Sequence, residues 1–578
     1  MLESASVARR PRASLALVLC VAVFAADPSN AAAPAPVEGK RAVLASAHPL
    51  ATEAGREILA AGGNAVDAAV AVSFALSVVE PWSSGLGGGA FAVVHMGGET
   101  RTFDMREMAP AAATRDMFAD PAKPGAPIPG ASTSTAKAAG IPGLVRGMAG
   151  LHASYGRLPF EAVVAPALRL AHDGFPVSRR LRDAIAQVGP QMNADAQRVF
   201  MPRGVVPAVG ERLVQADLAA TLERIAKTRG EDFYLGETAS ELVRSVTAAG
   251  GIWTAKDLAG YFWKEREPVR GAFRGFDVVS MGPPSSGGLL LVQMLGVVER
   301  MDSGRKATEG WNGADRLHRL AETMKRAFAM RAIGLADPDY VPVDHERFIG
   351  KAAMDGLAKA VGAARRATPA AAISKLKVTG GERTHTTHFE IVTAEGDGVA
   401  VTQTVNLWFG NAQVAGRTGV VLNNEMDDFA TLPGVPNAFG LVGDEGNAVA
   451  AGKRPLSSMT PTLVLKDGKV VGAFGSPGGS RIISTTFQVL LHVIVDGMDP
   501  SEALAAPRIH HQWMPDVLEV ERFLLSPETR RELEKRGHHI EERGRMGNAM
   551  AIWRRDDGQG GVLEGAADPR GEGSALGL

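Results

Sequence analysis

Cysteine is almost absent from this chain, with one residue, Cys20, among 578. A single cysteine excludes an internal disulfide framework and any zinc or iron–sulfur site built on several thiolates. An excess of either charge is also lacking, because 62 Lys and Arg residues face 63 Asp and Glu residues. Without a global positive field the chain has no general attraction for nucleic acid or an anionic membrane, so small molecules are the expected partners.

Long apolar runs are scarce as well. One covers residues 13–26, after three arginines within residues 9–12, and at about 14 residues it is shorter than the roughly 20 that a membrane helix needs. Small residues follow it, so the pattern predicts a signal peptide over residues 1–33 and an exported, periplasmic or secreted protein. Cys20 would leave with that peptide, and Leu19 before it does not suit a lipoprotein. No later stretch is long and apolar enough to cross a bilayer.

The chain before residue 386 is predicted to be mainly helical, and its length allows two to four domains or one large one. An almost wholly apolar helix is expected at 64–79, followed by a hairpin of strands at 90–96 and 101–105. Helical sequence dominates from about 144 to 357. Residues 359–381 lack periodicity and predict an exposed linker.

Strands take over after the linker. Two hairpins are predicted, one from residues 387–392 and 399–406, the other from 461–465 and 470–474. A buried helix is expected to follow at 481–494. Helix-rich sequence before strand-rich sequence predicts helical layers around antiparallel sheets.

Several common catalytic signatures are missing. The chain has no His-Glu-x-x-His motif and no Walker lysine motif. The glycines at 85–89 precede a strand and lack dinucleotide-loop spacing, and Phe474 breaks a Gly-x-Ser-x-Gly elbow at Ser476. Two histidine pairs remain as candidate metal ligands: His385 with His388, and His510 with His511. No carboxylate sits at a spacing that completes a metal site, so structural roles are expected.

A pattern of hydroxyls begins where the linker meets the next strand, at Thr386 and Thr387. A threonine pair by itself reflects only the strand preference of this residue. Period-2 alternation, however, puts Thr402, Thr404 and Asn406 on one face of the paired strand. A hydroxyl and an amide therefore point together toward the start of the neighbouring strand.

Gly478 and Gly479 lie between a predicted strand and the start of a helix. Two unhindered backbone N–H groups in that position can bind an anion. A threonine hydroxyl, a second hydroxyl to orient it and a backbone oxyanion hole make up an acyl-transfer site. A general base is the missing component.

Five motifs carry a family resemblance: Asp104–Pro110, Thr386–Phe389, Asn423–Phe429, Arg454–Met459 and Gly475–Arg481. By these motifs and their order, the chain from about residue 40 to its C-terminus resembles the gamma-glutamyltranspeptidase family of N-terminal nucleophile hydrolases. The resemblance implies an α+β fold, a four-layer αββα sandwich built from both fragments of a self-cleaved chain. It implies scission between His385 and Thr386, with a large subunit of residues 34–385 and a small subunit of residues 386–578.

The resemblance also supplies the base. An α-amino group ordinarily has a pKa of about 7.7–8.0, so part of the α-amine freed at Thr386 would be neutral near pH 7 and could take the hydroxyl proton. Thr386 would then attack the γ-carbonyl of glutathione or another γ-glutamyl compound, and water, an amino acid or a dipeptide would resolve the ester. Thr404 would orient Thr386, and the N–H groups of Gly478 and Gly479 would bind the oxyanion. No cofactor and no metal are implied.

The glutamyl group is expected to be recognised at both charged ends. Three residues are implied for its α-carboxylate: Arg106, Ser457 and Ser458. Three residues are implied for its α-ammonium: Asn406, Glu425 and Asp428. Their neighbours are expected to support the loop: Asn423, Asn424 and Asp427. Such a set reads a zwitterion, with a cation and donors for one end and carboxylates for the other.

Two features depart from the family pattern. Trp408 is bulky and lies beside the expected site, where it could change access for the acceptor. Residues 431–443 resemble a loop that covers the pocket in some members, with Phe439 where others carry tyrosine. Two alternatives remain open: an acylase acting mainly on glutaryl or other γ-glutamyl amides, and a homologue that binds γ-glutamyl ligands without processing itself.

Overall fold

The computed structural model describes residues 33–302, 310–374, 386–556, 558 and 561–578. His385, Cys20 and almost all of the expected signal peptide lie outside the described residues, as do residues 375–381 of the predicted linker.

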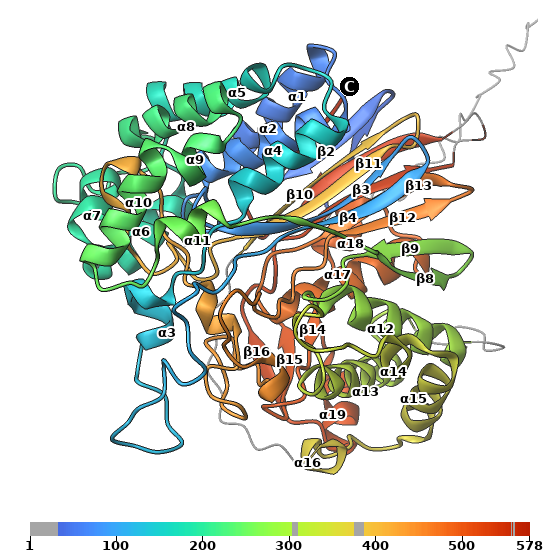
Figure 1. Ribbon diagram of the computed structural model, residues 1–578. Helices are drawn as coiled ribbons and strands as arrows, with labels where there is room; N and C mark the ends of the chain where they lie inside the picture. The colour runs from blue at the N-terminus through green and yellow to red at the C-terminus, as the bar shows by residue number, and fades with distance from the viewer. Residues whose placement is uncertain (1–32, 303–309, 375–385, 557, 559–560) are drawn as a thin grey trace, which may run out of the picture.

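Two seven-stranded antiparallel sheets lie face to face in the middle of the molecule (Figure 1). The first has the order β1 (Val37–Gly39), β18 (Val562–Ala567), β17 (Met550–Arg555), β13 (Lys469–Gly475), β12 (Thr462–Lys466), β9 (Phe276–Ser280) and β8 (Val269–Phe273). The second has the order β19 (Ser574–Gly577), β2 (Ala42–Ser46), β10 (Thr387–Thr393), β11 (Gly398–Thr404), β3 (Gly89–Met96), β4 (Glu99–Met105) and β7 (Lys264–Arg266). Each sheet combines strands from before and after residue 386, so the two parts of the chain form one sandwich.

Helices cover both outer faces. On the second sheet lie α1 (Pro49–Ala60), α2 (Ala65–Val79) and α4 (Leu144–Tyr155), with α5 (Phe160–Asp173) and α8 (Ala216–Thr228) outside them (Figure 1). On the first sheet lie α12 (Gly287–Asp302), α17 (Arg481–Ile494) and α18 (Pro500–Ala505). This order of layers confirms the expected α+β fold, a four-layer αββα sandwich. No helix in the described ranges is long and apolar enough to span a membrane.

The other elements of the described chain surround these layers. The helices are α3 (Ala131–Ser134), α6 (Arg179–Val188), α7 (Ala194–Phe200), α9 (Glu231–Leu235), α10 (Glu237–Ala248), α11 (Ala255–Ala259), α13 (Ala314–Arg331), α14 (His345–Ile349), α15 (Lys351–Ala363), α16 (Ala370–Ile373) and α19 (Pro527–Lys535). Two small sheets pair β5 (Phe175–Pro176) with β6 (Arg212–Leu213), and β14 (Ile509–His510) and β16 (Ile540–Arg543) with β15 (Leu518–Glu521).

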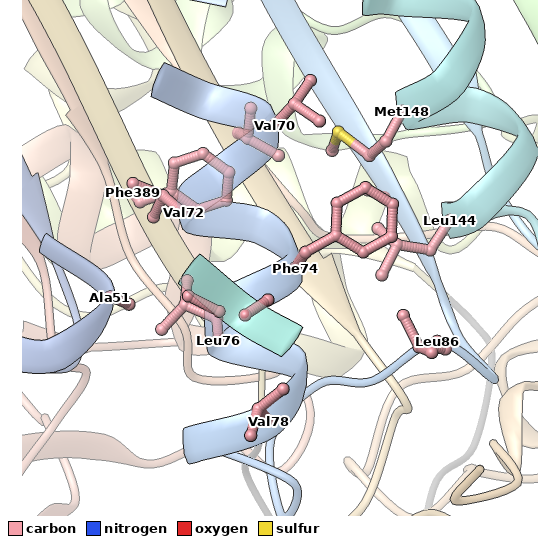
Figure 2. Close-up of a cluster of buried hydrophobic side chains, with 14 of the residues drawn as sticks. Ala51, Val70, Val72, Phe74, Leu76, Val78, Leu86, Leu144, Met148 and Phe389 are labelled. Atoms are coloured by element: carbon pink, nitrogen blue, oxygen red, sulfur yellow. The ribbon is translucent and has the colours of Figure 1, made fainter. Parts of the chain in front are cut away.

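Helix α2 is apolar all round because it lies between the second sheet and the outer helices. All of its residues are buried. Figure 2 shows Phe74 facing Leu144 of α4, while α2 also packs on β10, which carries Phe389. The helix begins as predicted, since the Asn64 side chain accepts hydrogen bonds from two backbone N–H groups of the first turn.

The structure departs from the predicted secondary structure in two places. The hairpin β8–β9 lies inside the stretch predicted to be mainly helical, because β8 is an edge strand with exposed residues and shows no clean alternation. Helix α15 continues to Ala363, into the predicted linker, since its Ala-rich sequence has high helix propensity. The hairpins at β3–β4, β10–β11 and β12–β13 and the helix α17 are confirmed.

Candidate functional site

Thr386 lies immediately before β10, beside the end of the neighbouring strand β11. Its Oγ1 is 3.4 Å from Oγ1 of Thr404, the last residue of β11, and both residues are buried. This separation is longer than the roughly 2.8 Å of an ideal hydrogen bond between hydroxyls. The Thr404 hydroxyl also accepts a 2.8 Å hydrogen bond from the backbone N–H of Asn406. The paired strands therefore hold the two hydroxyls together, as the period-2 pattern predicts.

Gly478 and Gly479 lie in the loop between β13 and α17. Their backbone φ angles are +139° and +57°, values that residues other than glycine rarely adopt. A Cβ built on Gly479 would lie 2.6 Å from the ring of Phe439. Across the described residues neither glycine N–H donates a hydrogen bond, so both remain available to an anion.

A small cavity of about 20 Å³ brings together nine of the ten residues expected in the site. Its lining includes Thr386, Thr404, Asn406, Arg106, Glu425, Asp428, Ser457, Ser458 and Gly479, together with Phe439, Leu441, Met459 and Ile482. The tenth, Gly478, lines a second cavity, and Thr386 lines both. The nucleophile candidate therefore stands between two cavities, with one glycine of the pair on each side.

A buried cluster of charges occupies the small cavity. The Arg106 guanidinium is fully buried, pairs with Glu425, and lies 2.5 Å from the carboxylate of Asp428. Burial lowers the pKa of Arg106, but the two carboxylates outweigh this effect and keep the pKa above its ordinary value. Burial raises the pKa of Glu425 and of Asp428, against the opposing effect of Arg106.

Two buried charged residues near this cavity were not predicted from the sequence. Glu107, adjacent to Arg106, lies 3.5 Å from its guanidinium. Arg331 of α13 donates to the hydroxyls of Ser286, at 3.0 Å, and Ser458, at 3.3 Å. Burial lowers the pKa of Arg331 to about 10. Glu107 could have been found inside the Asp104–Pro110 motif, whereas no local signal marks Arg331.

Ser457 and Ser458 are held by the segment before α12. The Ser286 hydroxyl donates to the carbonyl of Ser457 at 2.7 Å, and the N–H of Ser457 donates to the carbonyl of Pro284 at 2.8 Å. The Ser457 hydroxyl accepts from the N–H of Met459 at 3.1 Å. These bonds fix the backbone that presents both serines to the cavity.

The loop before Asp428 is held by its own asparagines, as expected. The amide of Asn423 donates to the carbonyls of Gly87, at 2.7 Å, and Gly140, at 2.8 Å. The Asn424 side-chain oxygen accepts from the N–H of Leu407 at 3.0 Å. Asn423 and Asn424 therefore support the short 3₁₀ turn Glu425–Asp428 and do not line the cavity.

The segment over residues 431–443 is attached to the site through Asn437. Its amide donates to the Asp428 carboxylate at 3.2 Å, and its oxygen accepts from the N–H groups of Phe439 and Leu441, each at 3.0 Å. The Phe439 ring is buried against Gly479. Asn437 thus ties this segment to Asp428 by a hydrogen bond, while Phe439 contributes ring packing and no hydroxyl.

The three candidate histidines in the described chain, His388, His510 and His511, have structural contacts. His388 is fully buried between Thr402, at 2.9 Å, and Glu390, at 3.1 Å, and burial lowers its pKa to about 3. His510 contacts Ser484 at 2.8 Å, and burial lowers its pKa to about 4. Within the described ranges no group of three or more His, Cys, Asp or Glu side chains is arranged to hold a metal ion.

The chain was compared with known proteins. A sequence profile described as Gamma-glutamyltranspeptidase matches residues 51–578. The chain is 43% identical over 539 residues to a glutathione hydrolase proenzyme of Escherichia coli, which covers 93% of this chain and 91% of the relative.

Solved structures agree with this match. The crystal structure of a cephalosporin acylase from Bacillus halodurans superposes with a TM-score of 0.81 at 29% identity, covering 96% of this chain and 99% of that one. A gamma-glutamyltranspeptidase chain of Helicobacter pylori covers 55% of this chain and 90% of its own length, with a TM-score of 0.53 and 37% identity. The sandwich is therefore the fold of N-terminal nucleophile hydrolases. On its sequence and its fold, the chain belongs to the gamma-glutamyltranspeptidase family.

Proposed function

We propose that this protein is a self-processing γ-glutamyltranspeptidase that also hydrolyses glutathione. The observation that carries the proposal is the position of the Thr386 hydroxyl. It lies next to Thr404 and lines the small cavity that holds Arg106, Glu425 and Asp428. Gly478 and Gly479 lie nearby, and their N–H groups have no hydrogen-bond partner in the described chain. These are the parts that acyl transfer through a covalent ester requires.

Self-cleavage comes first. The Thr386 hydroxyl attacks the carbonyl carbon of residue 385, the bond from that carbon to the Thr386 nitrogen breaks, and an ester forms. Water hydrolyses the ester and releases a large subunit of residues 34–385 and a small subunit of residues 386–578. Because both sheets combine strands from each part, the fragments remain together as a heterodimer.

The released α-amine of Thr386 then acts as the base in catalysis. It takes the hydroxyl proton as Oγ attacks the γ-carbonyl of the substrate, and returns a proton to the leaving amine. Thr404 orients the nucleophile through its hydroxyl. The N–H groups of Gly478 and Gly479 stabilise the oxyanion, and losing one such donor typically costs about 10²–10³ in rate.

The small cavity binds the amino-acid head of the γ-glutamyl group. Arg106 with Ser457 and Ser458 receives the α-carboxylate through charge-assisted hydrogen bonds. Asn406, Glu425 and Asp428 receive the α-ammonium. A buried set of one arginine and several carboxylates complements a zwitterion better than it complements either charge alone.

The main alternative is an acylase that prefers glutaryl amides, and the likeness to the cephalosporin acylase favours it. A glutaryl group has the carboxylate but lacks the ammonium. Glu425 and Asp428 would then face an uncharged methylene, and Arg106 would be left to balance two buried carboxylates as well as the carboxylate of the ligand. We therefore prefer a γ-glutamyl compound as the substrate. We also propose that the protein is exported and that residues 1–33 are removed.

A denaturing gel of the purified protein tests self-processing. Two bands are expected from the wild type and one from Thr386→Ala, while the control Thr393→Ala, at the far end of β10, still gives two. N-terminal sequencing of the smaller fragment should begin at Thr386. A single band from the wild type would contradict the proposal, and faster turnover of glutaryl than γ-glutamyl anilides would favour the acylase.

A further inference from the structure

Arg331 carries a buried positive charge that the proposed mechanism does not use. It is the last residue of α13 and is only 5% exposed. It contacts Ser458, which lines the small cavity, although Arg331 itself does not line it. In the part of the chain that the structure describes, no carboxylate lies within ion-pairing distance of its guanidinium. A desolvated cation without a counter-ion is costly, so an anion bound near it would be stabilised.

The fold stabilises this cation with dipoles instead of opposite charges. Its Nε donates to the hydroxyl of Ser286 at 3.0 Å, and its Nη2 donates to the hydroxyl of Ser458 at 3.3 Å. Arg331 also lies in the last turn of α13, where the backbone carbonyls of the helix end carry partial negative charge. Burial lowers its pKa to about 10, which leaves the guanidinium charged at neutral pH. The positive charge is therefore retained inside the protein.

The contact with Arg331 decides how the Ser458 hydroxyl can bind a ligand. A guanidinium has no acceptor atom, so the Ser458 oxygen accepts from it and the Ser458 proton points elsewhere. Ser457 is arranged in the same way, because its oxygen accepts from the N–H of Met459 at 3.1 Å. Neither hydroxyl donates to an acceptor within the described residues. Both serines therefore have a proton to donate to a ligand in the cavity that they line.

Arg106, in contrast, is already balanced by carboxylates. It pairs with Glu425, lies 2.5 Å from the carboxylate of Asp428 and lies 3.5 Å from that of Glu107. A ligand carboxylate beside Arg106 therefore also meets the repulsion of these acidic groups. Arg331 adds a positive charge on the serine side of the cavity, where no carboxylate of the described chain pairs with it.

We propose that Arg331 is a positioning residue for substrate recognition, which holds Ser458 as a hydrogen-bond donor and supplies the positive charge that selects an α-carboxylate over an uncharged group of the same shape. The inference rests on the proposed function, because the ligand is the γ-glutamyl donor. An α-carboxamide is disfavoured by the same arrangement, since its NH2 group brings donors to a site that already offers donors.

The test compares two donors of nearly the same shape, γ-glutamyl-p-nitroanilide and its α-carboxamide analogue. The wild type should prefer the carboxylate about 100-fold in kcat/KM, as expected for charge-assisted hydrogen bonds. Arg331→Gln should lower kcat/KM for the carboxylate about tenfold, mainly through KM, and change that for the carboxamide less than about threefold. Arg319→Gln is the matched control, because Arg319 lies on the same helix, pairs with Asp315 at 3.2 Å and does not line the cavity. It should leave the ratio unchanged.

A conservative variant keeps the charge but changes the hydrogen bonds. The compact ammonium of Arg331→Lys cannot reproduce the fork that reaches Ser286 and Ser458 together. Arg331→Lys should therefore give a carboxylate-to-carboxamide ratio about threefold below that of the wild type, between the wild type and Arg331→Gln. Two bands on a denaturing gel show that each variant has folded and processed itself. If Arg331→Gln remains uncut, Arg331→Lys decides the test.

A double-mutant cycle asks whether Arg331 acts through Ser458. Ser458→Ala should raise KM for γ-glutamyl-p-nitroanilide, and the addition of Arg331→Gln, or of Arg331→Lys, should then change KM less than about threefold. A purely structural role would lower the thermal midpoint and affect both donors alike in either background.

Three results would overturn the inference: no preference for the carboxylate in the wild type, an unchanged ratio in the Arg331 variants, or an equal loss with and without Ser458. Turnover of γ-glutamyl-p-nitroanilide by the self-cleaved wild type would still uphold the proposed function in each case. A wild type that neither cleaves itself nor turns over the anilide would contradict both.

Discussion

The carboxylate of Glu80 accepts a 2.7 Å hydrogen bond from the hydroxyl of Thr387, the residue after the candidate nucleophile. Glu80 follows α2 directly and is buried. Burial raises its pKa to about 7, against the opposing effects of Thr387 and Arg180, while Glu572 raises it further. The start of β10 is therefore anchored to a carboxyl group that changes charge near neutral pH.

The first prediction concerns pH and stability. Because the folded-state pKa of Glu80 lies above that of an unfolded chain, the folded state binds more protons between about pH 4.5 and 7. Glu80 should therefore lower the free energy of unfolding as pH rises through this window, by at most about 3 kcal/mol. Glu80→Gln should flatten the pH dependence of the thermal midpoint, whereas Glu57→Gln, at an exposed position of α1, should not. Equal slopes in both variants would contradict this role of Glu80.

The second prediction concerns the orienting hydroxyl. Thr404→Val keeps the shape of the side chain but removes its hydrogen bonds, so kcat should fall about 3- to 10-fold with a smaller change in KM. Thr404→Ser should restore most of kcat because it restores the hydroxyl. Steady-state kinetics on a γ-glutamyl anilide measure both. If Val and Ser behave alike, the hydroxyl of Thr404 has no orienting role.

The third prediction separates the oxyanion loop from simple backbone strain. Gly479→Ala places a methyl against the Phe439 ring and strains φ at +57°, whereas Gly497→Ala has similar strain at +69° with nothing within 4 Å. Gly497→Ala should lose about 1 kcal/mol of stability through backbone strain, and Gly479→Ala should lose more because the Phe439 ring must also move. Only Gly479→Ala should lower kcat, by at least about tenfold, since its displaced N–H no longer meets the oxyanion. Comparable kcat values would argue against the loop as oxyanion hole.

The fourth prediction concerns recognition of the donor. Asp428→Asn removes a charge expected to bind the α-ammonium, so KM for a γ-glutamyl anilide should rise about 10- to 100-fold. A glutaryl anilide lacks the ammonium and should lose much less. Asp427→Asn is the matched control, because Asp427 contacts Ser132 and the N–H of Ala438 instead of the cavity. A loss of the same size for both substrates would contradict the assignment.

Local sequence patterns predicted those elements whose stability is decided by near neighbours. The Asn64 cap, the apolar length of α2 and the hairpin β10–β11 follow from residues a few positions apart. The hairpin β8–β9 was missed because its edge strand is stabilised by pairing with β9 and packing on α12, which no local pattern reports.

The sequence by itself determined the order of the motifs, the residue types that acyl transfer requires, and hence the family. Only the tertiary structure decided which of these groups meet. Arg106 and Asp428 stand 322 positions apart and form an ion pair, and Arg331 reaches Ser458 from a helix without any motif. Such contacts depend on how sheets and helices pack, and spacing along the chain carries no record of that packing. The same packing placed Thr386 in the lining of two cavities, one with Arg106 and Asp428 and the other with Trp408 and Gly478.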